Sequence, residues 1–194
     1  MIPIPMRFDA FPLLWTLDDV YSPAECARII ADINASELKP AGKNPNYRNQ
    51  DRVMRDDPAA AEDLFQRLRS RIPKQMGPLS LVGLNERLRY YRYAPGQGFA
   101  PHVDHWFRPN PRQITLLTVL VYFNDDFTGG ETHFEEQLTE TEQFLKTVEP
   151  KPGRVAIFQH MVTHEGRPVR SGYKYAMRTD VVYEGDAEIG QISY

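Results

Sequence analysis

Strand-like runs fill the second half of this 194-residue chain, and they restrict its possible folds more than any other feature. Four runs are rich in β-branched and aromatic residues, as strands are. They cover residues 88–93, 114–124, 154–159 and 173–183. Glycine- and proline-containing turns separate them at spacings that suit antiparallel strands rather than βαβ units. The sequence therefore predicts a mainly β fold with a double-sheet jelly-roll core.

Two flanking helices are predicted in the first half. The motif SPAE at residues 22–25 supplies a capping serine, a proline for the first helical position and the glutamate of a capping box. An apolar residue then recurs at helical spacing up to Ile33. Asp57-Pro58 repeats the start signal, and we expect this second helix to run to Ile72 and end at Pro73. The helices should pack on the predicted β core.

A polar segment, residues 37–56, separates the two helices. It contains Pro, Gly and Asn and shows no clean helical or strand period, so we expect a long ordered loop. Long loops in compact domains are often functional. Arg48, Asn49 and Arg52 make the segment a candidate substrate-facing loop, and a plainly solvated loop is the equal alternative.

Length and composition favour one domain. A chain of 194 residues with 41% hydrophobic content can bury one good core. We expect a single domain over residues 1–194, with a helical N-terminal part at about 15–77 and the jelly-roll core at about 84–184. The sequence gives no indication of the oligomeric state.

Charge and cysteine usage exclude several classes of partner. The 23 basic and 26 acidic residues give a net charge of −3 without a long stretch of either sign, so neither a nucleic acid nor an anionic membrane is expected as a partner. Cys26 is the only cysteine, which excludes an internal disulfide and a cysteine-based zinc site. No signal peptide and no apolar run of bilayer length is recognisable. We expect a soluble, intracellular protein of the cytoplasm.

A candidate metal site begins at His102-Val103-Asp104. On an extended segment the imidazole and the carboxylate, two positions apart, point to the same face. His164, just after a predicted strand, offers a third ligand. Two histidines and one carboxylate form the facial triad of non-haem iron oxygenases, and a three-ligand zinc site would look similar. On residue types alone, both metals stay open.

A wider set of motifs narrows the choice. It comprises YAPGQGFAPHVD at residues 93–104, YFN at 122–124, GGET at 129–132, HEG at 164–166 and GYKY at 172–175. In order and spacing these closely resemble the prolyl 4-hydroxylase-like family of Fe(II)- and 2-oxoglutarate-dependent dioxygenases. The resemblance covers roughly residues 15–184. It implies a double-stranded β-helix, that is, a cupin-like jelly roll.

The resemblance also implies roles for individual residues. His102, Asp104 and His164 would be the catalytic iron ligands. Lys174, ten positions after the distal histidine, would bind the outer carboxylate of 2-oxoglutarate, and Tyr93 would donate its hydroxyl to the same group. The cofactors implied are Fe(II), 2-oxoglutarate and dioxygen, with ascorbate as a possible reductant. The reaction implied hydroxylates an aliphatic C–H bond and releases succinate and carbon dioxide; because Asp104 is retained, halogenation is disfavoured.

Other residues have less certain roles in this pattern. Thr118 and Tyr122 share one strand parity and are candidates to line the cofactor pocket, with core packing as the alternative. Arg178 and Asp180 share parity with Lys174, so they should also face inward, where they would either pair with each other or hold substrate. His160 is expected to be structural or to support a metal ligand, because its flanks are strand-like and no HExxH signature is present.

Competing functions follow from the same residues. One is a non-catalytic jelly-roll metal sensor or binding module, and another is a zinc hydrolase with the same three ligands. For the oxygenase, the resemblance allows a peptidyl proline, another protein side chain or a small molecule as the substrate. The sequence does not choose among these partners.

Overall fold

The four strand-like runs form the centre of one large sheet in the computed structural model, which describes residues 1–5 and 7–193. The corresponding strands are β7 (Arg87–Tyr93), β9 (Gln113–Tyr122), β13 (Val155–Gln159) and β16 (Lys174–Glu184). They pair in antiparallel fashion in the order β13-β9-β16-β7. All four predicted strands are therefore confirmed.

Strands from the first half extend this large sheet on both sides. β2 (Leu14–Leu17) pairs with β13, and β4 (Asp51–Asp56) pairs with β7 and with β3 (Lys39–Pro40). β6 (Leu79–Leu84) pairs with the end of β16 and with β5 (Gln75–Met76). The N-terminal part thus contributes strands as well as helices.

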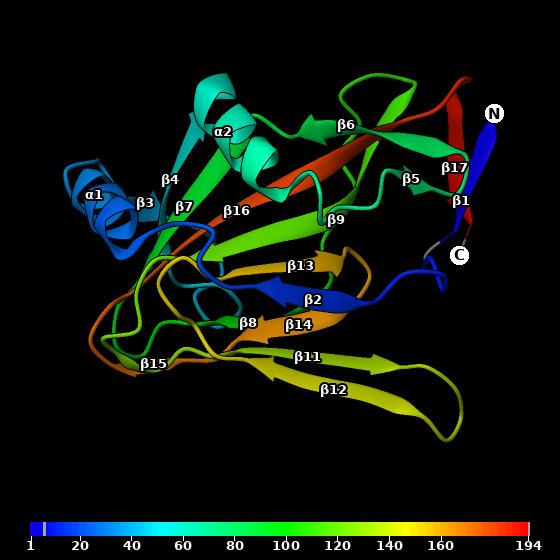
Figure 1. Ribbon diagram of the computed structural model, residues 1–194. Helices are drawn as coiled ribbons and strands as arrows, with labels where there is room; N and C mark the ends of the chain where they lie inside the picture. The colour runs from blue at the N-terminus through cyan, green and yellow to red at the C-terminus, as the bar shows by residue number, and fades with distance from the viewer. Residues whose placement is uncertain (6, 194) are drawn as a thin grey trace.

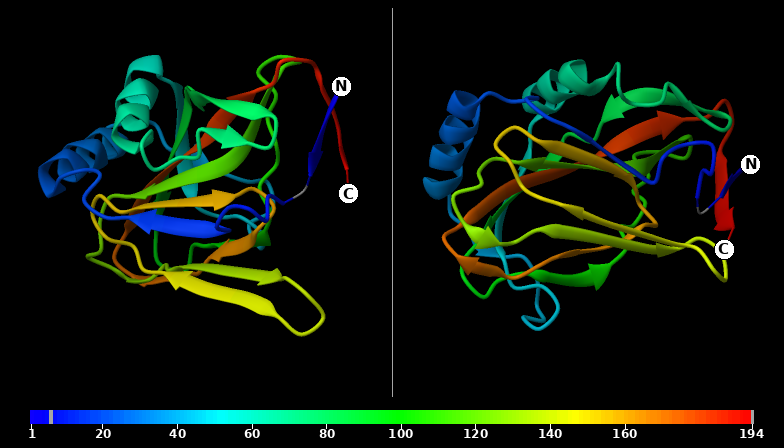
Figure 2. Two further views of the ribbon diagram at one scale, coloured as in Figure 1. Left: turned by 45° about the vertical axis from the view of Figure 1, so that its right-hand side comes forward. Right: turned by 60° about the horizontal axis from the view of Figure 1, so that its bottom comes forward.

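A smaller sheet lies opposite the large one, at the bottom of Figure 1. Its four strands are, in order, β12 (Gln143–Val148), β11 (Thr132–Gln137), β14 (Thr163–Gly166) and β8 (Phe99–His102). Two short pairs complete the fold: β10 (Thr128–Gly129) with β15 (Val169–Ser171), and β1 (Ile2–Pro5) with β17 (Ile189–Ser193). β1 and β17 bring the two ends of the chain together (Figure 2). The predicted double-sheet jelly roll is confirmed.

Both predicted helices are present, and they pack on one face of the large sheet (Figure 1). α1 (Pro23–Asn34) begins with the predicted capping box: the Ser22 side chain accepts from the Glu25 N–H, and the Glu25 carboxylate accepts from the Ser22 N–H at 2.7 Å. α2 (Pro58–Leu68) begins after the cap Asp57 but ends before the predicted stop. The chain turns after Leu68, and this turn still buries Ile72 in the core.

The two faces of the large sheet have different neighbours because strand side chains alternate. On one face, apolar residues of β9 and β16 pack with the helices, among them Val119, Val121, Met177 and Val181. On the other face, the side chains of Thr118 and Lys174 face the small sheet and line a cavity. A polar interior site therefore lies between the two sheets.

The prediction of a loop throughout residues 37–56 was wrong for residues 39–40, which form β3, and for its last part. Residues 51–56 form β4, which pairs with β7 along its whole length. Its sequence, DRVMRD, has no apolar alternation because the strand lies near the edge of the sheet and much of it is exposed. Only the partner strand makes this segment extended.

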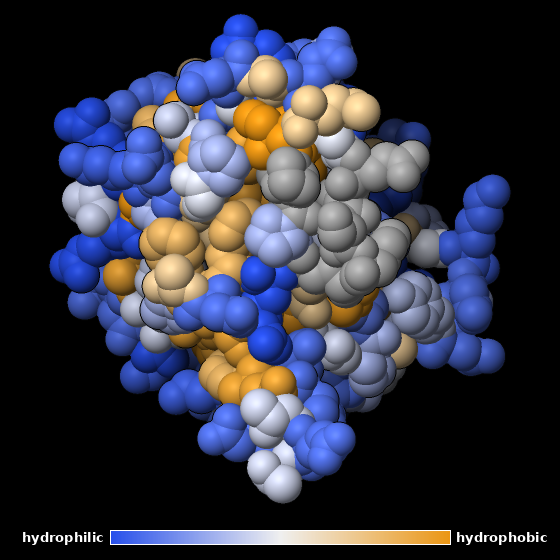
Figure 3. Space-filling model, turned by 90° about the vertical axis from the view of Figure 1, so that its right-hand side faces the viewer, coloured by the Kyte–Doolittle hydropathy of each residue, from blue (hydrophilic) through white to orange (hydrophobic). Residues whose placement is uncertain are grey.

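Apolar surface also reaches the outside of the molecule. Figure 3, viewed from the side of β1 and β17, shows hydrophobic surface in the middle of this face, surrounded by hydrophilic side chains. Within the residues that the structure describes, no helix has both the length and the apolar character needed to cross a membrane.

Candidate metal centre

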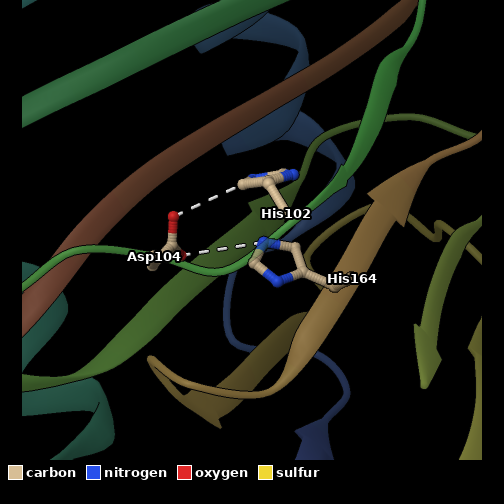
Figure 4. Close-up of side chains that lie close together, drawn as sticks. All are labelled: His102, Asp104 and His164. Carbon is tan, nitrogen blue, oxygen red and sulfur yellow. Dashed lines mark ion pairs between the residues drawn. The ribbon is translucent and has the colours of Figure 1, made fainter. Parts of the chain in front are cut away.

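The three sequence-predicted ligands converge between the two sheets (Figure 4). β8 pairs with β14 so that His102 and His164 are direct partners across the ladder. Asp104 follows β8, and its backbone N–H donates to the His160 carbonyl at 2.9 Å. The Nε2 atoms of His102 and His164 lie 3.9 and 3.7 Å from oxygens of Asp104. One candidate ligand atom from each residue lies within 4.8 Å of the other two, which suits a single metal ion.

Backbone carbonyls fix the orientation of both imidazole rings. Nδ1 of His102 donates to the carbonyl of Ala100, and Nδ1 of His164 donates to the carbonyl of Val162, each at 2.9 Å. A carbonyl only accepts, so the proton of each neutral ring lies on Nδ1 and the Nε2 lone pair faces Asp104. Burial lowers the pKa of His102 to about 4 and also lowers that of His164. Both rings are therefore neutral near pH 7, which is the form that binds metals.

Asp104 is held as a carboxylate by its neighbours. The Thr118 hydroxyl donates to Asp104 Oδ2 at 2.5 Å, and Nη2 of Arg178 lies 3.1 Å from Oδ1. Burial alone would raise the pKa of Asp104, but the charge of Arg178 and the hydrogen bond from Thr118 hold that pKa below its ordinary range. Asp104 is thus ionised and oriented at neutral pH.

His160 lies behind the candidate ligands rather than among them. Its Nδ1 is 2.9 Å from the Thr118 hydroxyl and its Nε2 is 3.1 Å from the Thr115 hydroxyl. Because both ring nitrogens are hydrogen bonded to threonines, the His160 side chain reaches Asp104 through Thr118. The structure places His160 as a support for the metal centre.

Lys174 lies in the same cavity and is 3% exposed. Its ammonium donates to the Gly130 carbonyl at 2.6 Å and lies 5.0 Å from the ring centre of Tyr93. Within the part of the chain that the structure describes, it forms no ion pair with an acidic side chain. Burial lowers its pKa to about 7. A buried cation of this kind favours a bound anion, because the anion supplies the missing counter-charge.

Gly130 shapes the space around Lys174. Its φ is +73°, and a Cβ at this position would approach Phe127 Cε2 at 2.8 Å and Lys174 Cδ at 3.3 Å. A larger residue would therefore be strained and would crowd the lysine.

The cavity unites most of the predicted site residues. It is lined by Tyr91, Tyr93, Phe99, His102, Asp104, Thr118, Leu120, Thr132, Phe158, His164, Gly166, Lys174, Ala176 and Arg178. Tyr122 lies outside this lining: it is fully buried, and its hydroxyl donates to Thr132 at 2.7 Å. Its proposed contact with the cofactor stays a prediction.

The predicted substrate residues occupy different positions. The Asn49 side chain accepts from the Gly98 N–H at 2.8 Å, which ties its loop to the turn before β8. Arg48 donates to the Tyr91 hydroxyl at 3.1 Å, and Arg52 lies on β4 opposite Tyr91. Sequence reasoning missed Tyr91 and Phe99, although Phe99 stacks on His102 with ring centres 3.5 Å apart. The available signals were the place of Phe99 three residues before His102 and that of Tyr91 two residues before Tyr93.

Comparison with known families identifies the domain that carries this centre. Residues 88–179 match the model of the 2OG-Fe(II) oxygenase superfamily, and this range contains His102, Asp104, His164 and Lys174. Residues 88–179 form a 2OG-Fe(II) oxygenase domain. This domain is that of a dioxygenase, whose cofactor and cosubstrates are Fe(II), 2-oxoglutarate and dioxygen.

Solved structures of similar shape support the double-sheet fold of this chain. A prolyl-4-hydroxylase from Pseudomonas putida has a TM-score of 0.61 and 20% identity, over 92% of this chain and 95% of that one. The viral collagen prolyl hydroxylase of Paramecium Bursaria Chlorella virus-1, in its 2OG complex, has a TM-score of 0.61 and 21% identity, over 90% and 98%. A prolyl hydroxylase from Trichoplax adhaerens has a TM-score of 0.65 and 15% identity, over 87% and 83%. A comparison with curated proteins finds no match.

Proposed function

We propose that His102, Asp104 and His164 hold the Fe(II) and that Lys174 binds the outer carboxylate of 2-oxoglutarate. The observation that carries this proposal is that the three candidate ligands and a buried lysine without an acidic partner among the described residues line one cavity. The donor set also fits, because two neutral imidazoles and one carboxylate leave coordination positions open for a cosubstrate and dioxygen.

The side chains of the site have separate tasks in this proposal. Iron held by the three ligands would supply, with 2-oxoglutarate and dioxygen, the oxidising chemistry that yields succinate and carbon dioxide. Thr118 and Arg178 keep Asp104 ionised and aimed at the metal. Phe99 and Phe158 pack against the two histidines, with ring centres 3.5 and 4.6 Å away, and exclude water from that side. The chain thus contributes orientation, charge and a dry pocket.

The proposed reaction is hydroxylation of an aliphatic C–H bond. The Pseudomonas putida and viral structures are named prolyl hydroxylases, and the Trichoplax adhaerens structure is a complex with a hypoxia inducible factor peptide fragment. These names make a peptidyl proline the first substrate to test. A small molecule with a comparable C–H bond is the alternative.

Succinate release tests the metal assignment. In the presence of Fe(II) and 2-oxoglutarate, His164→Ala should lose iron binding and all iron-dependent succinate release. His160→Ala should still bind iron, because the His160 side chain reaches Asp104 through Thr118 and does not point at the metal position. His133→Ala is the matched control: His133 is bonded to Thr147 between β11 and β12, outside the cavity lining.

Two results would contradict the proposal. If the His160 variant lost iron while the His164 variant kept it, the ligand assignment would be wrong. If the protein worked with zinc and needed no 2-oxoglutarate, the reaction class would be wrong. Complete absence of turnover in the iron-loaded wild type would favour the metal-binding sensor.

A further inference from the structure

Four arginines, the arginine cluster, lie beside the metal cavity on the inner face of the large sheet. They come from the loop after β3 and from β4, β7 and β16. The members are Arg48, Arg52, Arg89 and Arg178.

Strand register places three of these side chains on the cavity side. Tyr91 lines the cavity, and Arg52 is its direct partner across the β4–β7 pair, so the two side chains lie on the same face. Arg89 is two residues before Tyr91 on β7 and therefore shares this face. Arg178 is the direct partner of Arg89 across the β7–β16 pair and itself lines the cavity. The three side chains thus extend from the sheet face that carries the cavity.

Arg48 joins the cluster from the loop before β4. Its guanidinium lies 4.4 Å from the ring centre of Phe99 and 5.4 Å from that of Tyr91, and it donates to the Tyr91 hydroxyl. The charges of Arg48 and Arg89, together with burial as the largest cause, lower the pKa of Arg52. The cations of the cluster are therefore close enough to repel one another.

The acidic groups nearby do not balance this positive charge. Asp180 pairs with Arg178 at 2.8 Å and with Arg89 at 3.3 Å, and Asp104 pairs with Arg178 at 3.1 Å. Asp104 is also a proposed ligand of the iron. Within the described part of the chain, the Arg52 side chain makes neither a hydrogen bond nor an ion pair. The Nε–H of Arg178 is buried and has no partner either.

We propose that the arginine cluster binds a carboxylate of the substrate and so presents a neighbouring C–H bond to the metal centre. A singly charged carboxylate matches the one guanidinium, Arg52, that lacks any protein partner among the described residues, and arginine donors suit its planar geometry. The inference rests on the proposed function, because it assigns the substrate class of that same site.

Space for the rest of such a substrate adjoins the cluster. Arg89 also lines an open cleft of about 460 Å³ between β6, the start of β7 and the segment before β9. Val82 and Phe107 line this cleft and are 45% and 49% exposed. A substrate held by its carboxylate at the cluster can therefore extend away from the metal along a partly apolar surface.

Matched pairs of probes test the proposal and distinguish the source of the carboxylate. One pair is a proline-containing peptide with Asp next to the proline and its Asn counterpart. The other pair is free L-proline and L-prolinamide. Dissociation constants are measured by calorimetry on protein loaded with Fe(II) and 2-oxoglutarate without oxygen, so that no turnover occurs.

The acidic member of at least one pair should bind about tenfold more tightly than its neutral counterpart, as expected for one charge-assisted contact. A preference in the peptide pair assigns an acidic peptide, and a preference in the proline pair assigns a small amino acid. Arg52→Gln should remove the preference and Arg52→Lys should restore part of it. Arg71→Gln is the control, because Arg71 is exposed and lies outside the linings of the cavity and the cleft.

Equal binding within both pairs, or no binding of either acidic probe, would overturn the proposal, and so would a preference that survives Arg52→Gln. Succinate release by wild-type protein without probe is measured in parallel. If succinate is released while the acidic preference is absent, only the carboxylate site is wrong; if no succinate is released with or without probe, the proposed function itself fails.

Discussion

Lys174 and Arg178 lie four residues apart on the same face of β16, yet their surroundings are opposite. Lys174 has a backbone carbonyl as its hydrogen-bond acceptor and no acidic partner among the described residues, and burial lowers its pKa to about 7. Arg178 contacts two carboxylates, Asp104 and Asp180, which hold its pKa above the ordinary value despite burial. Lys174, at the start of the strand, therefore offers charge to a ligand, whereas Arg178, near its middle, uses most of its charge to hold a proposed metal ligand in place.

Replacing Arg178 should have the largest effect on stability. Arg178→Met leaves the buried carboxylates of Asp104 and Asp180 without their shared cation, which costs about 3 kcal/mol or more in the free energy of unfolding. Urea denaturation of the metal-free protein measures this loss. Lys174→Met is the comparison, because it removes a buried cation that has no acidic partner. Equal destabilisation by both variants would show that Lys174 and Arg178 do not differ in their electrostatic surroundings.

Replacing Lys174 should instead act on ligand affinity. Lys174→Met should weaken 2-oxoglutarate binding by about 100-fold, because a charge-assisted hydrogen bond to the outer carboxylate is lost. The metal-free variant should be at least as stable as the wild type. Calorimetric titration with 2-oxoglutarate measures the first effect. Unchanged affinity would place the outer carboxylate elsewhere.

Thr118 tests how far the support of Asp104 matters. Thr118→Val removes the hydroxyl that donates to Asp104 and should weaken Fe(II) binding by about tenfold, as expected when a partner of a metal ligand is lost. Tyr122→Phe is the matched control, since it removes a buried hydroxyl from the same strand that bonds only to Thr132. The expected order of iron affinity is wild type equal to Tyr122→Phe, then Thr118→Val. The reverse order for the two variants would contradict the assignment.

The smallest expected effect is a pH dependence that belongs to Lys174 alone. In the folded, ligand-free protein its pKa is about 7, against an ordinary value of 10.5. Between these values the unfolded chain binds more protons than the folded one, so stability rises with pH across this window. The contribution is at most about 1.4 kcal/mol per pH unit. Denaturation at pH 7.5 and 8.5 should show this rise in wild type and a smaller one in Lys174→Met.

Bound 2-oxoglutarate should raise the pKa of Lys174 again, because its carboxylate favours the charged lysine. Binding at pH 8.5 should then be accompanied by proton uptake, which titrations in buffers of different ionisation enthalpy measure. Proton uptake of equal size in Lys174→Met would show that another group takes up the proton.

Local patterns were sufficient for the elements whose own residues encode them. The capping box before α1 and the dense β-branched and aromatic runs of β9 and β16 do not depend on distant partners for their signal. β4 was missed because a charged strand next to the sheet edge has no such signal until β7 pairs with it. The same limit applies to His160, whose support of Asp104 through Thr118 depends on three segments meeting in space.

The sequence by itself determined the jelly-roll class, the likeness to a known oxygenase family and the set His102, Asp104, His164 and Lys174, because these depend on residue type, order and spacing. Only the tertiary structure decided which charges have partners. Arg52, Arg89 and Arg178 are far apart along the chain, and strand register alone places them on one face beside the metal cavity. Pairing between distant strands sets that register, so the unbalanced positive charge beside the metal centre can be recognised only in the folded molecule.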